Sequence, residues 1–278
     1  MLTRDLKKGS MSKSQSRSVW GSGAAYELFG RWSRLVARKF LTWLAMAFSV
    51  RWLDVGCGTG ALSETILTEA GPAAVHSIDP SENYFALARE QVRDPRVHFE
   101  SGDARQLPVA SATYDAVVSG LVLNFIPDLR PGLAEMVRVT KHGGTVAAYV
   151  WDYVGKMELM RYFWDAAVAV KPEAREQDEG RRFPICQPDP LRNLFVEADL
   201  REVDIDSIDV PTHFRDFDDY WLPFLGGQFL APDYAMSLSE KDRAALRERI
   251  RATLPFSDDG TIRLAARAWV VRGKRTSQ

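Results

Sequence analysis

The sequence predicts an α/β fold in which a mostly parallel β-sheet is wrapped by helices. Over residues 51–149, short apolar runs alternate with amphipathic stretches, which is the pattern of strands joined by crossover helices. The stretch LDVGCGTG at residues 53–60 places three glycines between the first apolar run and a helical stretch, as ligand-binding turns of such sheets do. With 278 residues the chain can bury a substantial core, so we expect one large domain.

Seven segments have the apolar pattern of strands. They lie at residues 52–55, 75–78, 97–100, 116–119, 145–150, 203–210 and 261–273. Helical periodicity predicts a first helix that follows Thr59 and runs to residue 69, and further helices at residues 82–92, 127–139, 157–170, 189–198 and 239–253. We expect Thr59 and Ser81 to cap the first two helices, and Gly143-Gly144 to form the turn that enters the fifth strand. The charged stretch at residues 173–182 is predicted to be a linker.

Composition divides the chain into a leader and a single folded domain. Residues 1–18 combine lysine, arginine and serine with few apolar side chains, so we expect a disordered leader. Residues 19–278 are predicted to form one domain, with its core at about residues 51–152, 189–212 and 261–273. Helical segments at about residues 19–48, 153–188 and 213–260 are predicted to cap the ligand site; the alternative is that they only bury hydrophobic surface.

Charge and cysteine usage argue against several classes of protein. The formal net charge is −1, so no global basic field attracts nucleic acid or an acidic membrane, and we expect neither as a partner. The apolar stretch at residues 40–50 is too short to span a bilayer. Cys57 and Cys186 form no CxxC pair, which suggests neither a disulfide framework nor zinc and is typical of a reducing cytoplasm. No cluster at metal-ligand spacing lies near the strand ends, so we expect no metal.

The glycine loop alone leaves its ligand open. Backbone N–H groups at such a turn approach a ligand closely, and the spacing from Gly56 to Ala61 also satisfies the permissive dinucleotide fingerprint. Further polar residues follow the other predicted strands: Asp79, the motif GDARQLP at residues 102–108 and the motif YDAVVSGLVLNF at residues 114–125. Because the carboxyl ends of parallel strands meet at one edge, we expect these motifs to surround one ligand.

Taken together, residues 52–149 resemble a class I S-adenosylmethionine-dependent methyltransferase of the type that methylates small molecules. The flanking motifs GRWSR and YVWDY are similar to a bacterial branch of that family. The resemblance implies a Rossmann-like, seven-stranded, mostly parallel sheet with helices on both faces and the last strand antiparallel. It also implies S-adenosylmethionine as cofactor, S-adenosylhomocysteine as product and a small-molecule acceptor.

The resemblance assigns the parts of the cofactor to particular residues. Asp54 orients the loop or meets the methionine ammonium, Asp79 accepts from the ribose hydroxyls, and Asp103 accepts from the adenine amine. Each acid has a structural alternative, as a loop tie, a helix-start residue or a turn residue, and Cys57 is expected to be a small packed residue. The expected cofactor-binding residues are Tyr26, Arg31, Asp54, Gly56, Cys57, Gly58, Gly60, Asp79, Pro80, Ser81, Asp103, Ala104, Gly120 and Leu121.

Methyl transfer from a sulfonium is an in-line displacement, so alignment and exclusion of water are the main requirements, and the acceptor atom can be oxygen, nitrogen or carbon. His213 and Tyr153 are the candidate catalytic residues, with a structural role as the alternative. The candidates for lining an acceptor pocket are Trp151, Phe163, Trp164, Trp221 and Phe224, which can equally be core. Two other functions remain open: a NAD- or FAD-dependent oxidoreductase, and a catalytically silent binding protein of the same fold.

Overall fold

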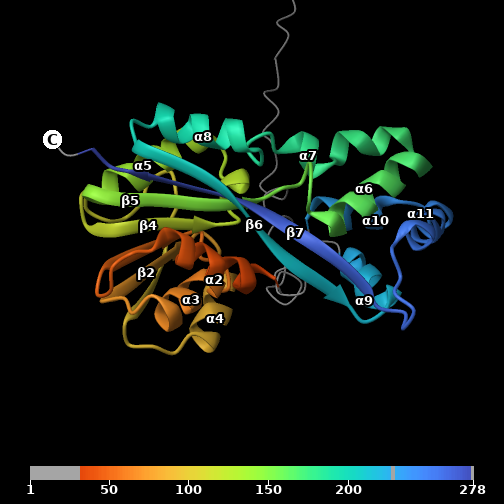
Figure 1. Cartoon of the computed structure of the whole chain (residues 1–278), viewed down its shortest axis with the longest axis horizontal. Coiled ribbons are helices and arrows are strands. Elements are labelled where there is room, and N and C mark those ends of the chain that lie inside the picture. The colour runs from red at the N-terminus through yellow and green to blue at the C-terminus, as the bar shows by residue number, and fades with distance from the viewer. Residues whose placement is uncertain (1–31, 227–228, 277–278) are drawn as a thin grey trace, which may run out of the picture.

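The computed structural model describes residues 32–226 and 229–276, and its centre is one seven-stranded sheet (Figure 1). The strand order is β3-β2-β1-β4-β5-β7-β6. The strands are β1 (Arg51–Val55), β2 (Ala74–Asp79), β3 (Val97–Ser101), β4 (Tyr114–Gly120), β5 (Thr140–Trp151), β6 (Arg201–Phe214) and β7 (Ile262–Lys274). All pairs from β3 through β5 are parallel, whereas β7 is antiparallel to both β5 and β6. The predicted seven strands and the antiparallel last strand are therefore confirmed.

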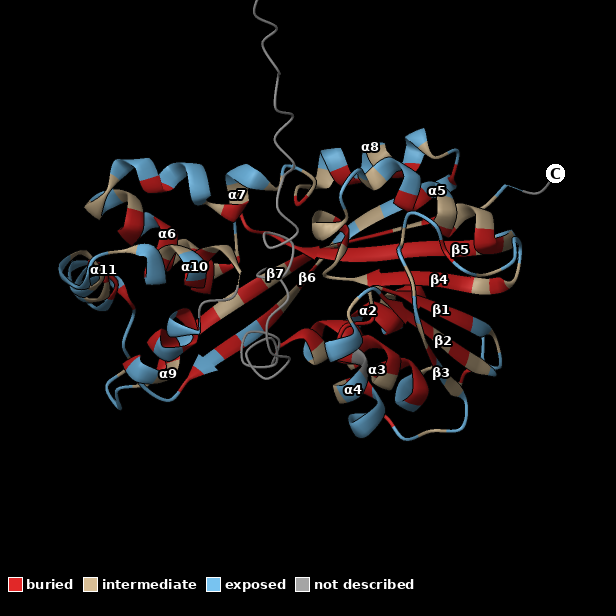
Figure 2. Ribbon diagram, turned by 180° about the vertical axis from the view of Figure 1, so that it is seen from behind, coloured by how far each residue is buried: buried red, intermediate tan, exposed pale blue. Residues whose placement is uncertain are grey.

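Helices cover both faces of this sheet. On one face lie α2 (Ser33–Leu44), α3 (Ala61–Glu69) and α4 (Glu82–Gln91), and on the other lie α5 (Leu129–Val139) and α8 (Pro188–Glu197) (Figures 1 and 2). Strands β1 and β4 and the part of β5 from Thr145 to Trp151 are almost entirely buried because they are covered on both sides (Figure 2). This burial explains why their sequences read as continuous apolar runs rather than as alternating patterns.

A second lobe lies beyond the carboxyl ends of β4 and β5 (Figure 1). It contains α6 (Glu158–Val170), α7 (Glu179–Arg182), α9 (Phe217–Trp221), α10 (Leu230–Ser237), α11 (Glu240–Thr253), and the short 3₁₀ helices η2 (Pro172–Gln177) and η3 (Leu222–Leu225). Its core is aromatic: the Phe163 and Phe224 rings stack with centroids 4.4 Å apart, and Tyr220 donates to the Leu159 carbonyl. Strands β6 and β7 remain paired from the sheet into this lobe, so both lobes share two strands.

Local expectations were wrong at three places. The α3 helix begins after Gly60 in a left-handed conformation, so Thr59 is not its cap. Strand β5 begins at Thr140, ahead of Gly143-Gly144, which therefore lie within the strand. The charged stretch at residues 173–182 forms η2 and α7 instead of a linker. Ser81 does stand at the start of α4, although its side chain makes no capping bond there.

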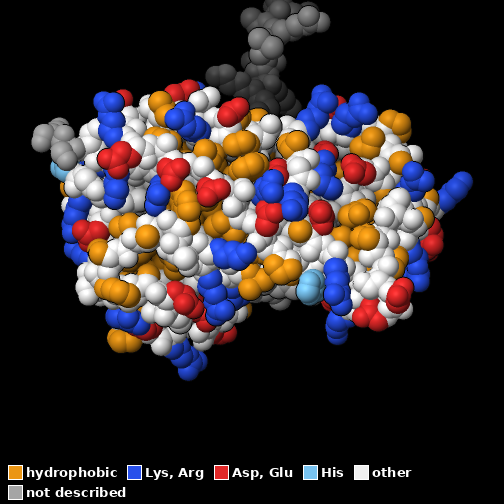
Figure 3. Space-filling model, in the orientation of Figure 1, with side chains coloured by type: hydrophobic (Ala, Val, Ile, Leu, Met, Phe, Trp, Pro, Cys, Tyr) orange, Lys and Arg blue, Asp and Glu red, His pale blue; other side chains and the backbone are white. Residues whose placement is uncertain are grey.

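None of the helices in residues 32–226 and 229–276 combines the length and the apolar character that crossing a bilayer requires. Lys and Arg side chains are interspersed with Asp and Glu over the face seen in Figure 3. That face presents no large surface of a single charge.

Candidate functional site

The glycine loop follows β1 at the point where the strand order reverses between β1 and β4. Gly56 has a φ of +75°, and a Cβ added to it would lie 2.9 Å from Val122 Cβ and Cγ2 and nearer still to Cγ1. No larger residue fits between the loop and the segment after β4. Open α/β sheets bind ligands at this switch point, so the loop stands where a cofactor is expected.

The backbone donors of this loop are already used within the protein. Gly56 N and Cys57 N donate to the Ile78 carbonyl at 2.7 and 3.1 Å, and Gly58 N donates to Asp79 Oδ2 at 2.9 Å. A pyrophosphate cradle requires such N–H groups to point at the ligand. The loop is therefore built to let a ligand approach closely, and it is not arranged to bind phosphate through these donors.

Asp79, the last residue of β2, is held by two backbone amides. Its Oδ2 accepts from Gly58 N and its Oδ1 accepts from Ser81 N, each at 2.9 Å, and the residue is 6% exposed. Burial raises the pKa of Asp79, and the two amide bonds oppose that rise. Because each carboxylate oxygen can accept more than one hydrogen bond, Asp79 remains able to accept from a ligand while its orientation is fixed.

Asp54 lies behind the loop and ties it to the sheet. It is fully buried; Ser63 Oγ of α3 donates to Asp54 Oδ2 at 2.7 Å, and the Ser63 and Ser77 hydroxyls are also 2.7 Å apart. Burial raises the pKa of Asp54 to about 7, with the neighbouring Asp79 adding to the rise and the Ser63 bond opposing it. The geometry matches the loop-tie alternative for this residue.

Asp103 is exposed and is already paired. Arg105 Nη2 lies 2.6 Å from Asp103 Oδ2, and Arg105 N donates to Oδ1 at 2.8 Å. The bonds from Arg105 lower the pKa of Asp103, so its carboxylate stays ionised. A ligand at this corner therefore meets a carboxylate and guanidinium pair, where sequence reasoning expected a lone acid.

A cavity of about 250 Å³ lies over the carboxyl ends of β1 to β4; we call it the cofactor cavity. Of the residues expected from the sequence, it is lined by Gly56, Gly58, Asp79, Pro80, Asp103, Ala104 and Leu121. Expected residues that do not line it are Asp54, Cys57, Gly60, Ser81 and Gly120. Tyr26 and Arg31 lie outside the described residues. Burial raises the pKa of the Cys57 thiol well above its ordinary value, which fits a packed residue.

Several lining residues were missed by sequence reasoning. Tyr84, in the first turn of α4, is 1% exposed and lines the cofactor cavity, as do Arg105, Val122 and Ile126. Tyr84 follows Asp79 closely in sequence and lies in the first turn of the next helix, beside the end of β2. The spacing between the two residues could therefore have predicted that Tyr84 lies near the site. Leu121 has a φ of +61°, a strained value for a residue with a branched side chain, in the segment that separates this cavity from the next.

A second cavity of about 80 Å³ adjoins the first and shares Leu121 and Phe125 with it; we call it the acceptor cavity. Its other lining residues are Trp151, Tyr153, Met157, Met160, Glu179, Phe183, Phe229, Leu230 and Pro232. Aromatic rings form part of the wall: the Phe125 centroid lies 5.4 Å from that of Phe183, and the Tyr153 centroid lies 6.0 Å from it. Of the five aromatic residues that the sequence suggested, only Trp151 lines this cavity.

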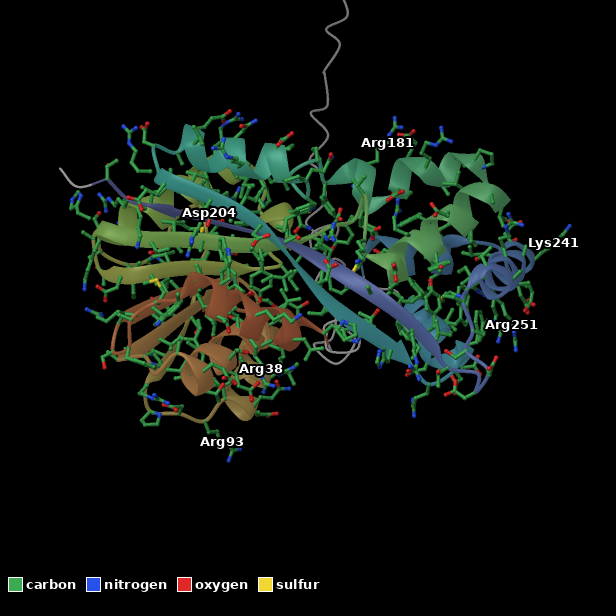
Figure 4. All side chains as sticks on the ribbon, viewed as in Figure 1. Arg38, Arg93, Arg181, Asp204, Lys241 and Arg251 are labelled. Carbon is green, nitrogen blue, oxygen red and sulfur yellow. The ribbon has the colours of Figure 1, made fainter. Side chains whose placement is uncertain are left out.

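Glu179 is the only charged side chain among the residues that line the acceptor cavity in the described parts of the chain. It is 3% exposed, and Trp164 Nε1 donates to its Oε2. Burial raises the pKa of Glu179 to about 7; the nearby Asp178 adds to the rise, while the Trp164 bond and Arg161 oppose it. Glu179 stands in a run of charged residues, so nothing in its sequence context predicts a buried carboxyl group here. Arg181, two residues later, points outward (Figure 4).

The two candidate catalytic residues differ in their distance from the acceptor cavity. Tyr153 follows β5, is 8% exposed and lines the acceptor cavity. His213 is an exposed residue of β6 opposite Arg263 in β7, and it lines neither the cofactor nor the acceptor cavity. The structure therefore brings Tyr153 to the site and leaves His213 away from it.

Within residues 32–226 and 229–276, one group of side chains could bind a metal: His76, His98 and Glu100, whose ligand atoms lie within 4.8 Å of one another. The parallel pairing of β2 with β3 brings them together. His76 Nε2 is 2.9 Å from Glu100 Oε2, and His76 Nδ1 is 2.6 Å from Tyr114 Oη. The group lies in the middle of β2 and β3 and lines neither cavity. Sequence reasoning missed it because the pairing of His76 with His98 depends on strand register.

Comparisons with known proteins agree with this geometry. A family model described as a methyltransferase domain matches residues 53–148. A demethylmenaquinone methyltransferase from Shouchella clausii is 33% identical over 172 residues, covering 56% of this chain and 72% of the relative. One from Desulfitobacterium hafniense is 31% identical over 169 residues, covering 54% of this chain and 65% of the relative.

Solved structures share the fold. The phosphoethanolamine N-methyltransferase 2 of Haemonchus contortus, in complex with S-adenosylmethionine, has a TM-score of 0.60 and 17% identity, covering 98% of this chain and 62% of that one. The antiparallel β7 between β5 and β6 also departs from the paired parallel halves of a dinucleotide-binding fold, which argues against the oxidoreductase alternative. The chain therefore belongs to the class I S-adenosylmethionine-dependent methyltransferases, and it is an enzyme whose cofactor is S-adenosylmethionine.

Proposed function

We propose that this enzyme methylates an apolar, ring-bearing small molecule that binds in the acceptor cavity. The observation that carries the proposal is the position of this cavity, which shares Leu121 and Phe125 with the cofactor cavity. The two cavities therefore adjoin at these two residues, so a ligand in one lies next to a ligand in the other. Such proximity is what an in-line displacement requires.

The residues of the cofactor cavity fit S-adenosylmethionine, which contains no phosphate and supplies a methyl group bound to a positively charged sulfur. Asp79 is oriented by two amides and is suited to accept from the ribose hydroxyls. The Asp103 and Arg105 pair lies at the end of β3, where the adenine is expected. Gly56 and Gly58 allow the methionine portion to lie against the backbone.

The walls of the acceptor cavity favour a flat, apolar acceptor. Phe125, Tyr153, Phe183 and Phe229 come from four separate segments and present rings to one space. Aromatic walls bind planar rings by stacking and edge-to-face contacts, and they exclude water from the reacting atoms. Relatives named demethylmenaquinone methyltransferase act, by their name, on a ring-bearing molecule, which supports the same class of acceptor.

The reaction needs little from the protein besides alignment. The backbone of Leu121 has a left-handed conformation, and its N–H donates to the Tyr149 carbonyl at 2.8 Å. These constraints hold Leu121, which lines both cavities, in one place. The buried walls keep water from competing with the acceptor for the methyl group. We further infer a cytoplasmic location, which the two free and buried cysteines, Cys57 and Cys186, support.

Calorimetric titration tests the first part of the proposal. We expect the protein to bind S-adenosylhomocysteine and S-adenosylmethionine and to give no heat with NAD or FAD. Product assays with a library of ring-bearing molecules then test the acceptor class through the formation of S-adenosylhomocysteine. Binding of NAD without any response to S-adenosylhomocysteine would refute the proposed function.

A further inference from the structure

We propose that the acceptor carries a hydroxyl group on an apolar ring and that Glu179 accepts the hydroxyl proton as the methyl group is transferred. This inference rests on the proposed function and adds the chemical class of the acceptor and a catalytic residue. It starts from the placement of one carboxyl group in a cavity whose other described lining residues are uncharged.

Among residues 32–226 and 229–276, no cation is bonded to the carboxyl group of Glu179. Arg161 of α6 is the nearby cation, and its Nη2 is engaged with Asp178 Oδ2 at 2.7 Å. The side chain that donates to Glu179 is Trp164, whose indole is neutral. Burial of a carboxylate without a counter-ion is costly, so a buried structural acid is normally paired. Glu179 is held in place by a hydrogen bond and keeps its ability to gain or lose a proton.

The surroundings set when that proton is bound. The ionisable groups that face Glu179 are Asp178 beside it, Arg161 of α6, the buried thiol of Cys186, and Tyr153 across the cavity. Burial is the largest cause of the raised pKa of about 7, so both forms of Glu179 are populated near neutral pH. A proton acceptor of this strength matches the requirement for general base catalysis at neutral pH.

The step balances in atoms and charge. The bond from the acceptor oxygen to the methyl carbon forms as the bond from that carbon to sulfur breaks, and the electron pair of the broken bond stays on sulfur. The hydroxyl proton moves to the Glu179 carboxylate. A sulfonium cation and a carboxylate anion are thereby replaced by a neutral thioether and a neutral carboxylic acid, so the reaction removes both charges from a poorly solvated site.

The same carboxylate selects among acceptor groups. A carboxylate acceptor would be repelled by ionised Glu179, and an ammonium group would bind to it but has no lone pair to attack the methyl carbon. A ring hydroxyl is neutral, donates a hydrogen bond to Glu179 and, with a pKa of about 10, is far closer in acidity to the carboxyl than an amine N–H is. The geometry therefore favours a hydroxyl over the other common acceptors.

Glu179→Gln tests the inference, because the amide keeps the shape and can still accept from Trp164 but cannot take up a proton. Glu176→Gln is the matched control: Glu176 lies in η2, is exposed, and has Arg181 Nη2 3.3 Å from its Oε1. The probes are 4-ethylphenol, 4-ethylaniline and 4-ethylbenzoate, each offered to the full chain with S-adenosylmethionine for turnover and with S-adenosylhomocysteine for calorimetric binding.

We expect the wild type and Glu176→Gln to methylate 4-ethylphenol, with a rate that rises with pH and levels off above about pH 7. Glu179→Gln should lose about 100-fold or more in rate and lose this pH profile, while its affinity for S-adenosylhomocysteine stays unchanged. 4-Ethylbenzoate should bind the wild type about 10-fold more weakly than 4-ethylphenol. In Glu179→Gln the difference in affinity between these two probes should be smaller.

Equal rates for Glu179→Gln and Glu176→Gln, tighter binding of 4-ethylbenzoate than of 4-ethylphenol, preferential turnover of 4-ethylaniline, or no binding of any probe to the S-adenosylhomocysteine complex would each overturn the inference. Failure of the wild type to bind S-adenosylhomocysteine would overturn the proposed function itself. The two failures are thus distinguishable.

Discussion

Replacing Asp79 with alanine tests whether its carboxylate binds the cofactor or only organises the loop. The chain offers a matched control in Asp152, which follows β5 as Asp79 ends β2. Asp152 is 5% exposed, and its two oxygens accept from Gly155 N at 2.8 Å and Lys156 N at 3.0 Å. Asp79 is 6% exposed and accepts from Gly58 N and Ser81 N at 2.9 Å. Only Asp79 lines the cofactor cavity.

Each substitution removes two hydrogen bonds to a charged acceptor, worth about 1.5–3 kcal/mol apiece before water replaces part of the loss. We therefore expect Asp79→Ala and Asp152→Ala to lower the free energy of unfolding by a similar amount, about 2–4 kcal/mol. Asp79→Ala should in addition weaken S-adenosylhomocysteine binding by about 10–100-fold, because the bonds to the ribose hydroxyls are lost.

Denaturant unfolding measures the first effect and calorimetric titration the second. If Asp152→Ala weakens S-adenosylhomocysteine binding as much as Asp79→Ala does, the loss reflects general destabilisation, and the assignment of Asp79 to the ribose is refuted. Unchanged affinity in a folded Asp79→Ala variant would refute it equally, and would leave the acid with the structural role of fixing the loop.

Three further predictions follow from other residues. Gly56→Ala should destabilise the fold by about 2 kcal/mol or more and abolish S-adenosylhomocysteine binding. Gly143 has a φ of +73°, and a Cβ added to it would have no atom within 4 Å, so Gly143→Ala should show only the smaller backbone cost in a thermal melt. Equal destabilisation by the two substitutions would contradict the steric argument. Because burial raises the pKa of Glu179 from 4.5 to about 7, the wild type should lose about 3 kcal/mol more unfolding free energy than Glu179→Gln between pH 4.5 and pH 8, as measured by denaturant unfolding; equal losses in the two proteins would contradict the raised pKa. Cofactor binding should survive dialysis against EDTA, and a loss restored by magnesium would show that a metal is required.

Much of the fold was predictable because buried parallel strands leave continuous apolar runs. The predicted strand at residues 75–78 and the observed β2 differ by one residue at each end, and β2 places Asp79 at its carboxyl end as expected. The glycine loop was also predictable from the sequence, because Gly56 lies where no side chain fits and the position therefore requires glycine. These features are local, so spacing along the chain is enough to find them.

The parts that sequence reasoning missed depend on contacts between distant segments. Whether Asp103 is free or paired depends on the rotamer of Arg105, and whether His213 faces a site depends on the face of β6 on which it falls. Glu179 is the clearest case: its neighbours in sequence are charged, so composition predicted a linker. Only the packing of α7 against Trp164 of α6 turns this one acid inward.

The strands shared by the two lobes have a consequence for how the chain can be divided. The family model matches residues 53–148, yet seven consecutive residues of β5, from Thr145 to Trp151, are buried and pair with β7, which returns from the end of the chain. A fragment cut after the matched segment would expose the edge of β5 as a row of unpaired backbone groups between apolar side chains. Such a fragment should aggregate, so exchange of acceptor lobes between relatives requires breakpoints in the loops after β5, after β6 and before β7, with the strands themselves retained.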